Sequence, residues 1–514
     1  MFKTTHFPNN YKMIDSKKPF GFNCSQAIHT RCNVRVSVIF AALAILAGTG
    51  VAQAAPPPIG IAAAADGTAP ATGGFWGFTD GINRSSSLLG DLWGLRTDLS
   101  RYGMTLSVAE TSESLGNVTG GTQKGFSYDG LTQAVLQMNT QRAFGWYGGL
   151  MNISALQIHG HNLSANNLQS LQTASGIEAE RGFRLWEMWY DQKFLDEDRL
   201  DIKIGQQSID QEFIVSSNAL MFVNTMFGWP MLPSADMPGG GPAYPLSAPG
   251  IRVAMRPADG LSVLAGVFNG SPTGSDPAGD AQQQNRHGVN FPLGDGTLSM
   301  LELQFSYPAL GSMVMADEAP PLGWTYRIGA WYNSEQFADQ RFNQSGQALA
   351  NPDSNPNPLQ HHGNFSYYAV ADQLVWRDNT ELNRTLAIFA RVMATPLADR
   401  NLIDRSLNAG VVLHCPFAYR TYDTLGLAVG YAHVSSSAAG LDQDTAYYTG
   451  VYTPKRSAET FAELTYQYQV KPWLQVQPDI QYVINPGGAL NNPADPGNRI
   501  KNELVLGLRT NIAF

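Results

Sequence analysis

The sequence has little cysteine, little charge and no long apolar run after its first 54 residues. It contains 3 cysteines in 514 residues, and Cys24 and Cys32 lie in the basic and apolar N-terminal stretch. Because that stretch has the pattern of an export signal, its removal would leave Cys415 as a lone thiol. A disulfide framework within one chain is therefore excluded.

The overall composition leaves two structural classes open. Charged residues make up 15% of the chain, aromatic residues reach 11%, and glycine contributes 51 residues. No later segment has the roughly 18 uninterrupted apolar residues of a membrane-spanning helix. A large soluble domain has such a composition, and so does a membrane barrel, which hides its hydrophobicity in alternation.

The sequence also lacks the short motifs that mark common catalytic and nucleotide-binding sites. It has no G-x-S-x-G, H-E-x-x-H, Walker A or G-x-G-x-x-G pattern. His159 and His161 share one strand face, and His361-His362 falls in an expected long loop, but two ligands without a third make a weak metal site. No pair of carboxylates stands out as catalytic. We therefore predict no enzyme activity, no cofactor and no metal.

The N-terminal stretch predicts a signal peptide over residues 1–54. Six basic residues precede the apolar run 36–48, and Ala52-Gln53-Ala54 supplies a small-x-small cleavage pattern. A membrane-anchoring helix is the alternative, but the run is short for a span. Translation starting at Met13 stays open. Cleavage removes six bases and one acid, which leaves 27 basic and 41 acidic residues and a net charge of −14. This acidic balance argues against nucleic acid as a partner.

Two segments separate the signal from the periodic part of the chain. Residues 55–74 are rich in proline, alanine and glycine and predict a flexible leader. Residues 75–103 predict a segment with a short amphipathic helix, capped by Ser87 at its start and closed by Gly103. The apolar residues at helical spacing in this helix are Leu88, Leu92, Leu95, Leu99 and Tyr102.

From Met104 onward the sequence alternates with a period of two. In NELVLGLRTNIAF, residues 502–514, the leucines fall on one side, and Val505, Gly507 and Arg509 fall on the other. TFAELTYQYQV and LQVQPDIQYVIN alternate in the same way, and Lys471-Pro472 between them predicts a hairpin. The same test predicts sixteen strands, which start near Met104, Gly130, Gly148, Gly182, Arg199, Gly250, Leu261, Thr297, Gly323, Gly363, Glu381, Ser406, Asp423, Thr460, Trp473 and Glu503.

The connections between these strands alternate in length. The short ones include 142–148, 194–199, 256–260, 377–380 and 471–472, and the long ones are 160–181, 208–249, 270–296, 334–362, 434–459 and 485–502. Short turns at one end and long loops at the other are typical of bacterial outer-membrane barrels. An even number of strands then places both chain ends, with the segment 75–103, on the periplasmic side.

The pattern thus predicts an all-β fold, a closed antiparallel transmembrane β-barrel over residues 104–514. In a closed barrel the last strand pairs with the first, so neither remains an edge. We expect its apolar face to meet outer-membrane lipid, with Phe514 in the aromatic girdle. A terminal aromatic residue on such a strand resembles the signal that the barrel-assembly machinery reads in porins, which makes that machinery an expected partner.

Several stretches resemble the carbohydrate-selective porins of the OprB type, over about 75–514. The resemblance is carried by LLGDLWGLRTDLSRYGMTLSVAETSESLGNVTGG, KIGQQSIDQEFIVSSNALMFVNTMFGWP, APGIRVAMRPADGLSVLAGVFNGSP and WLQVQPDIQYVINPGG, followed by VLGLRTNIAF. It implies a sixteen-stranded porin that passes neutral sugars across the outer membrane. Small sugars such as glucose are then the expected solutes, and both a monomer and a homotrimer stay open.

Parity predicts which charged residues face the pore. Arg252 and Arg256 lie opposite Ile251, Val253 and Met255, which places them inward. The same test places Glu187 inward, opposite Trp186 and Met188. It also places these residues inward: Asp201, Lys203, Arg391 and Arg509. A wall of both signs suits polyhydroxyl solutes, which donate and accept hydrogen bonds. Apart from Asp201, these residues are candidates for the sugar path. The alternative is that they only solvate a water-filled channel.

The longest connection, 208–249, predicts a constriction loop. Its aromatic residues are too numerous for a loop wholly in water, so we expect it to fold into the lumen: Phe213, Phe222, Phe227, Trp229 and Tyr244. Sugar faces stack on aromatic rings, so Trp229 and Phe227 join the candidate path. The alternative is that these rings pin the loop to the wall.

Three functions are compatible with such a barrel. The first is passive, sugar-preferring diffusion of small neutral carbohydrates. The second is a lipase-like barrel enzyme, because His433 falls on the apolar parity of its strand and serines follow at 435–437. The third is an export channel for surface polysaccharide, which needs a wider lumen. The resemblance favours the first.

Overall fold

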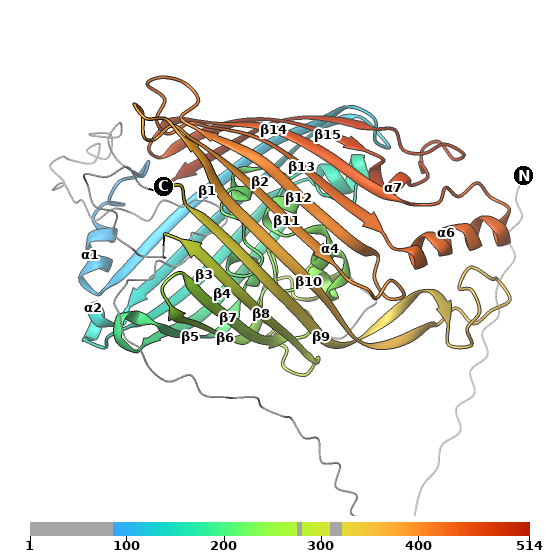
Figure 1. Ribbon diagram of the computed structural model, residues 1–514, viewed down its shortest axis with the longest axis horizontal. Coiled ribbons are helices and arrows are strands. Elements are labelled where there is room, and N and C mark those ends of the chain that lie inside the picture. The colour runs from blue at the N-terminus through green and yellow to red at the C-terminus, as the bar shows by residue number, and fades with distance from the viewer. Residues whose placement is uncertain (1–85, 275–279, 309–320) are drawn as a thin grey trace, which may run out of the picture. The chain divides into compact units, whose positions relative to one another are not determined.

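The computed structural model describes residues 86–274, 280–308 and 321–514. The predicted signal peptide and leader lie outside the described residues. The described chain forms sixteen antiparallel strands that close into a barrel in which β1 pairs with both β2 and β16 (Figure 1). The strands are β1 (Met104–Thr119), β2 (Gly125–Asn139), β3 (Gly149–Gly160), β4 (Gly182–Phe194), β5 (Leu200–Gln207), β6 (Ala248–Ala258), β7 (Leu261–Asn269), β8 (Thr297–Tyr307), β9 (Trp324–Asn343), β10 (Pro358–Arg377), β11 (Thr385–Ala394), β12 (Ile403–His414), β13 (Thr424–Val434), β14 (Ala458–Lys471), β15 (Leu474–Ile484) and β16 (Glu503–Ala513).

Helices in the described residues are short and lie in the connections. They are α1 (Leu95–Arg101), α2 (Thr140–Phe144), α3 (Thr225–Gly228), α4 (Met231–Asp236), α5 (Ala281–Gln284), α6 (Ser436–Thr449) and α7 (Pro486–Ala489). Single π or 3₁₀ turns occur at Ser164–Leu168, Asp196–Asp198, Ile209–Gln211, Ala219–Met221 and Pro238–Gly240. α1 and α2 lie at one end of the barrel, and α6 and α7 at the other (Figure 1). None of the described helices is long and apolar enough to cross a membrane.

Alternation along each strand explains why the chain closes into this fold. In β11, Ile388 and Val392 are 40% and 47% exposed on the outer face, whereas Phe389 and Arg391 are buried on the inner face. In β16 the outward Leu508 is 47% exposed and the neighbouring inward Val505 is fully buried. Apolar outward residues meet lipid, and the inner face is free to be polar. The predicted sixteen-stranded barrel and its closure are confirmed.

The sorting of connections by length is real but less strict than predicted. The predicted loop 334–362 is wrong. β9 continues to Asn343 and β10 begins at Pro358, so only 344–357 is loop. Each of these strands has 20 residues, whereas about 9–11 cross a bilayer, so the hairpin continues beyond the membrane. His361-His362 accordingly lies in β10 rather than in a loop. The loop end also carries the short connections 120–124 and 395–402.

The helix predicted within 75–103 is shorter than expected. α1 spans only Leu95–Arg101, because Leu92 and Trp93 have positive φ angles of 51° and 58° that a right-handed helix cannot include. Arg96 on α1 donates hydrogen bonds to the backbone carbonyl oxygens of Phe514 and, at 3.2 Å, of Leu106. The segment before the barrel therefore contacts the ends of both closing strands.

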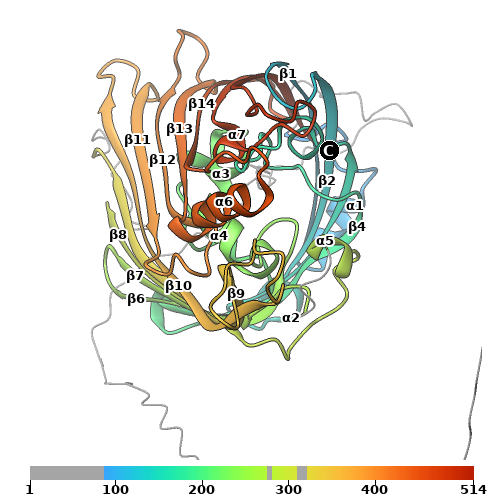
Figure 2. The same ribbon diagram turned by 90° about the vertical axis from the view of Figure 1, so that its right-hand side faces the viewer.

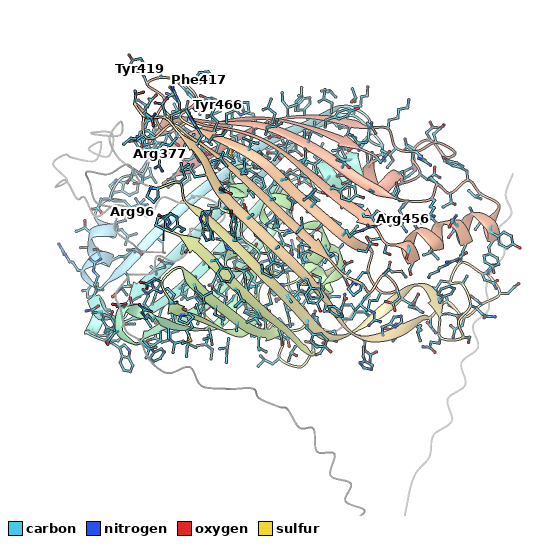
Figure 3. All side chains as sticks on the ribbon, in the orientation of Figure 1. Arg96, Arg377, Phe417, Tyr419, Arg456 and Tyr466 are labelled. Carbon is cyan, nitrogen blue, oxygen red and sulfur yellow. The ribbon has the colours of Figure 1, made fainter. Side chains whose placement is uncertain are left out.

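The turn that precedes β13 carries an ion pair at the end of the barrel that holds α1. The Arg420 guanidinium donates to both carboxylate oxygens of Asp423, each at 2.7 Å, and lies 3.9 Å from the ring centroid of Tyr468. Burial alone would raise the pKa of Asp423, but hydrogen bonds from Arg420 and Tyr466 outweigh it and lower that pKa below its usual value. The ring of Tyr466 lies 6.0 Å from that of the turn residue Phe417, between centroids (Figure 3).

Candidate functional site

The functional site is the lumen, which is narrowed by the connection between β5 and β6. We call residues 208–247 the constriction loop, since β6 begins at Ala248, slightly earlier than predicted. Its helices α3 and α4 lie inside the ring of strands (Figure 2). Loop rings pack on the inner wall: Phe227 lies 5.3 Å from Phe461 of β14, and Phe222 lies 5.7 Å from Phe389 of β11, between ring centroids. The predicted in-folding of this loop is confirmed.

Carboxylates on the inner wall hold the backbone of the constriction loop. They project from β8, β10 and β14 and accept hydrogen bonds from loop N–H and hydroxyl groups, which would otherwise lack partners. Glu302 accepts from the N–H of Ile214 at 2.8 Å, Asp372 from the Ser216 hydroxyl at 2.7 Å, and Glu463 from the N–H groups of Val223 and Asn224 at 2.6 and 3.0 Å. The loop is thus attached to several sides of the wall.

Arg391 on β11 donates hydrogen bonds to backbone carbonyl groups of the same loop. Its side chain is 1% exposed and donates to the carbonyl oxygens of Ile214, Phe227 and Gly228 at 3.0, 3.1 and 3.2 Å, and also to that of Met226. The five N–H donors of a guanidinium suit such a set of converging carbonyls. This contact fixes α3 against the wall.

Arg509 on β16 provides a further attachment beside the barrel closure. It forms an ion pair with Glu113 on β1, the strand that closes the barrel with β16. Its terminal Nη2 atom donates to the carbonyl oxygen of Val223 at 3.3 Å. The same arginine therefore links both closing strands to the constriction loop.

A second cluster of charges lies where β4, β5 and β6 meet the start of the loop. Arg252 on β6 forms ion pairs with Asp201 on β5 and Glu212 of the loop, and lies 3.8 Å from Asp191 on β4. Lys203 pairs with the same Glu212 and lies 4.3 Å above the ring of Trp189. Two cations and three carboxylates make this part of the wall rich in both donors and acceptors.

Glu187 on β4 and the loop aromatics have structural partners. Glu187 accepts from the N–H of Ser208, the first residue of the constriction loop, at 3.1 Å. Phe227 is fully buried, and Trp229 is 6% exposed and donates its indole N–H to the Gly240 carbonyl at 2.9 Å. These contacts favour the alternative in which the rings pin the loop.

A family comparison assigns this architecture. The model of the carbohydrate-selective porins, the OprB family, matches residues 123–514. The chain belongs to this family. It is a carbohydrate-selective porin of the bacterial outer membrane, and the barrel and lumen described above are those of a channel.

Individual relatives agree with this assignment over most of the porin. Porin B of Pseudomonas aeruginosa is 26% identical over 456 residues, which cover 84% of this chain and 92% of that protein. A putative porin of Acinetobacter baylyi, QuiX, is 21% identical over 418 residues, or 78% of this chain and 89% of that one. The high-pH structure of Pseudomonas putida OprB covers 84% of this porin and 99% of its own chain, with a TM-score of 0.72. At 22% identity that structure supports the fold alone.

Two predicted positions in the porin differ from the structure. Arg256 does not lie beside the constriction loop, because the register shifts after Met255 and its side chain donates to the turn carbonyls of Glu197 and Asp198. Trp186 is buried rather than outward, because a register shift opposite Ser154 turns it inward with Glu187. A bulge interrupts parity in both places.

Sequence reasoning missed most of the wall carboxylates of this porin. Glu302 and Glu463 lie between apolar residues on their strands, so the parity test contains the signal that would have found them. Asp372 lies between Ala371 and Gln373, which gives a weaker signal. Their partners in the constriction loop carry no such signal. Within residues 86–274, 280–308 and 321–514, no group of three or more His, Cys, Asp and Glu side chains is arranged to hold a metal ion.

Proposed function

We propose that this porin passes small neutral sugars such as glucose by passive diffusion and prefers them over other solutes of similar size. The observation that carries the proposal is the attachment of the constriction loop to β8, β10, β11 and β14. A loop fixed on several sides of a wet lumen sets a narrow path of constant width. Small solutes then pass close to the wall.

The mixed charges at Arg252 support the sugar preference. Arg252 and Lys203 alternate with carboxylates, so a sugar hydroxyl finds a donor and an acceptor within one cluster. A wall of one sign would instead favour ions of the other sign. We assign Arg252 and Lys203 to the sugar path, with Glu212 and Asp201 as their acceptor partners. Arg391, Arg509 and Glu187 hold the loop, and Arg256 belongs to the turn.

The enzyme and export alternatives have less support. His433 pairs with Asp404, Nδ1 to Oδ1 at 2.7 Å, at the loop end of β13, but the Ser435 hydroxyl accepts from the N–H of Ala438 and caps α6. Membership in a family of porins supports a channel rather than an enzyme. A loop folded into the lumen favours small solutes over an exported polymer. An ester-hydrolysis assay of the purified barrel tests the enzyme alternative directly.

The other expected partners remain proposals. Outer-membrane lipid is expected around the apolar outward residues, and the barrel-assembly machinery is expected to recognise β16 with Phe514. Cleavage after Ala54 is expected to precede assembly. Mass spectrometry of the purified protein from cells checks the cleavage position.

Single-channel recording of three proteins tests the assignment of the sugar path. In the wild type, glucose should reduce small-ion current in a saturable way. Arg252→Ala should weaken that block and shift ion preference toward cations, because three carboxylates lose their main counter-charge. Arg256→Ala is the matched control and should behave as the wild type. Equal behaviour of the two variants would contradict the assignment.

A further inference from the structure

Helix α6 lies across the opening at the loop end of the barrel, which we call the outer mouth (Figure 2). The chain leaves the wall after Val434 of β13, and Asp444 of α6 forms an ion pair with Arg341 of β9. Three strands, β10, β11 and β12, separate β9 from β13 along the wall. The helix has 14 residues and is about 21 Å long. It therefore connects two separate parts of the wall above the lumen.

The part of β9 that holds α6 projects beyond the neighbouring strand. β8 pairs with β9 only as far as Asn333, so residues 334–343 extend past the end of β8. This projection is itself fixed, because the N–H of Gln340 donates to the carbonyl oxygen of Asp399, in the connection between β11 and β12, at 2.7 Å. Arg341 follows Gln340 directly, so its backbone is held in place before it reaches α6.

The ion pair between β9 and α6 has bidentate geometry. Arg341 donates to both carboxylate oxygens of Asp444, from Nε to Oδ2 at 2.7 Å and from Nη2 to Oδ1 at 2.9 Å. The guanidinium also lies against Gly440 of the helix, where an added Cβ would come within 2.7 Å of Nη1. Two parallel hydrogen bonds give such a pair a defined direction. Arg341 therefore sets the position of α6 as well as attaching it.

Further contacts hold the start and the middle of α6. The N–H of Ser435, the residue that caps the helix, donates to the carbonyl oxygen of Leu402 at 2.8 Å. Asp442, which is buried, accepts from the backbone N–H of Arg456 and from its Nε, each at 2.9 Å. Arg456 lies at the loop end of the barrel (Figure 3). The helix is thus attached at several points along its length.

We infer that α6 is a second size filter of this porin, at the outer mouth, and that Arg341 and Asp444 are the positioning residues that set its width. A helix held at several points cannot move aside, so a solute must pass beside it before it reaches the constriction loop. Pore width decides which solutes enter such a path. The inference rests on the proposed passage of small solutes through the lumen, and it concerns their size, whereas the sugar preference belongs to the cluster around Arg252.

Polyethylene glycols of graded size, added to one side of a single channel, test this inference without any sugar. A polymer that enters a mouth lowers the small-ion conductance, so the smallest polymer without effect gives the size limit of that mouth. In Arg341→Gln this limit should shift to larger polymers on the loop side and stay at the wild-type value on the turn side. The exchange Arg341→Asp, Asp444→Arg should restore the wild-type limit, because the ion pair forms again. The recordings need low ionic strength, since salt screens partly exposed ion pairs.

Asp444→Asn breaks the same ion pair from the side of the helix. It should give the same loop-side shift as Arg341→Gln, so the measurement does not depend on the assembly of one variant. Arg420→Gln is the matched control, because it removes an Arg–Asp pair of similar bidentate geometry at the turn end of the barrel. Its loop-side limit should equal that of the wild type.

Two outcomes would overturn the inference. The first is a loop-side limit that is the same in the wild type, Arg341→Gln and Asp444→Asn. The second is a shift of equal size on both sides of the membrane, because the change would then lie in the shared lumen. A wild type without saturable glucose block, but with the loop-side shift in both variants, would contradict the sugar preference and support the outer filter.

Discussion

Two glutamates on β1 lie on opposite sides of the barrel wall and have different surroundings. Glu113 faces the lumen, is 1% exposed and forms an ion pair with Arg509. Glu110, three residues earlier, faces outward and is surrounded by Thr132, Ser112 and His159. The inner carboxylate has a permanent cation, whereas the outer one depends on hydroxyl groups and an imidazole.

The difference shows how the surroundings of each side decide what the wall can carry. On the inner side, water and the constriction loop supply partners, so several strands carry charges. On the outer side, hydrocarbon supplies none, and the outward residues are mostly apolar. The chemistry of transport therefore lies on the inner side.

The largest expected loss of stability comes from placing a charge on the lipid-facing side of the wall. Leu301→Arg puts a cation on the lipid face of β8 and should reduce the free energy of unfolding by about 2–4 kcal/mol. Gln304→Arg, on the inner face of the same strand, should cost much less because water reaches it. Urea titration of the barrel in lipid vesicles measures both values. Equal losses would mean that the two sides do not differ as described.

A smaller, local effect is expected when the constriction loop loses its contact with Arg391 of β11. Arg391→Met leaves the carbonyls of Ile214, Met226 and Phe227 without their charged donor and should destabilise the loop by about 1.5–3 kcal/mol. Hydrogen exchange of the backbone over 214–228 should quicken while exchange in the strands stays the same. Arg405→Met, at the exposed end of β12, is the control and should leave the loop unchanged. Unchanged exchange in the Arg391 variant would remove its anchoring role.

The sequence was sufficient for the fold because alternation is a local signal. The predicted strand starts fall within a few residues of the observed ones, and Arg391 and Arg509 face inward as parity requires. Parity failed at Arg256 and Trp186, where register shifts add a residue to one strand, and such bulges leave no mark in the sequence. The helix before β1 was also overestimated, because spacing does not reveal a positive φ angle.

The site was less accessible to prediction because its contacts are distant in sequence. Ile214 and Glu302 are 88 residues apart, and Val223 and Glu463 are 240 apart, so no local pattern pairs them. The polar outward residues Glu110 and Ser112 of β1 were missed for another reason. β1 carries polar residues on both sides, so its alternation does not show which side meets the membrane.

Liposome swelling with sugars of increasing size tests the central claim most directly, namely that the anchored constriction loop makes this lumen a sugar-preferring channel. Vesicles that contain the wild-type porin should take up glucose at a rate that saturates with concentration and exceeds that of uncharged non-sugar solutes of equal size. Disaccharides should enter more slowly, because the path is narrow and fixed. Uptake that never saturates and depends on solute size alone would contradict the claim.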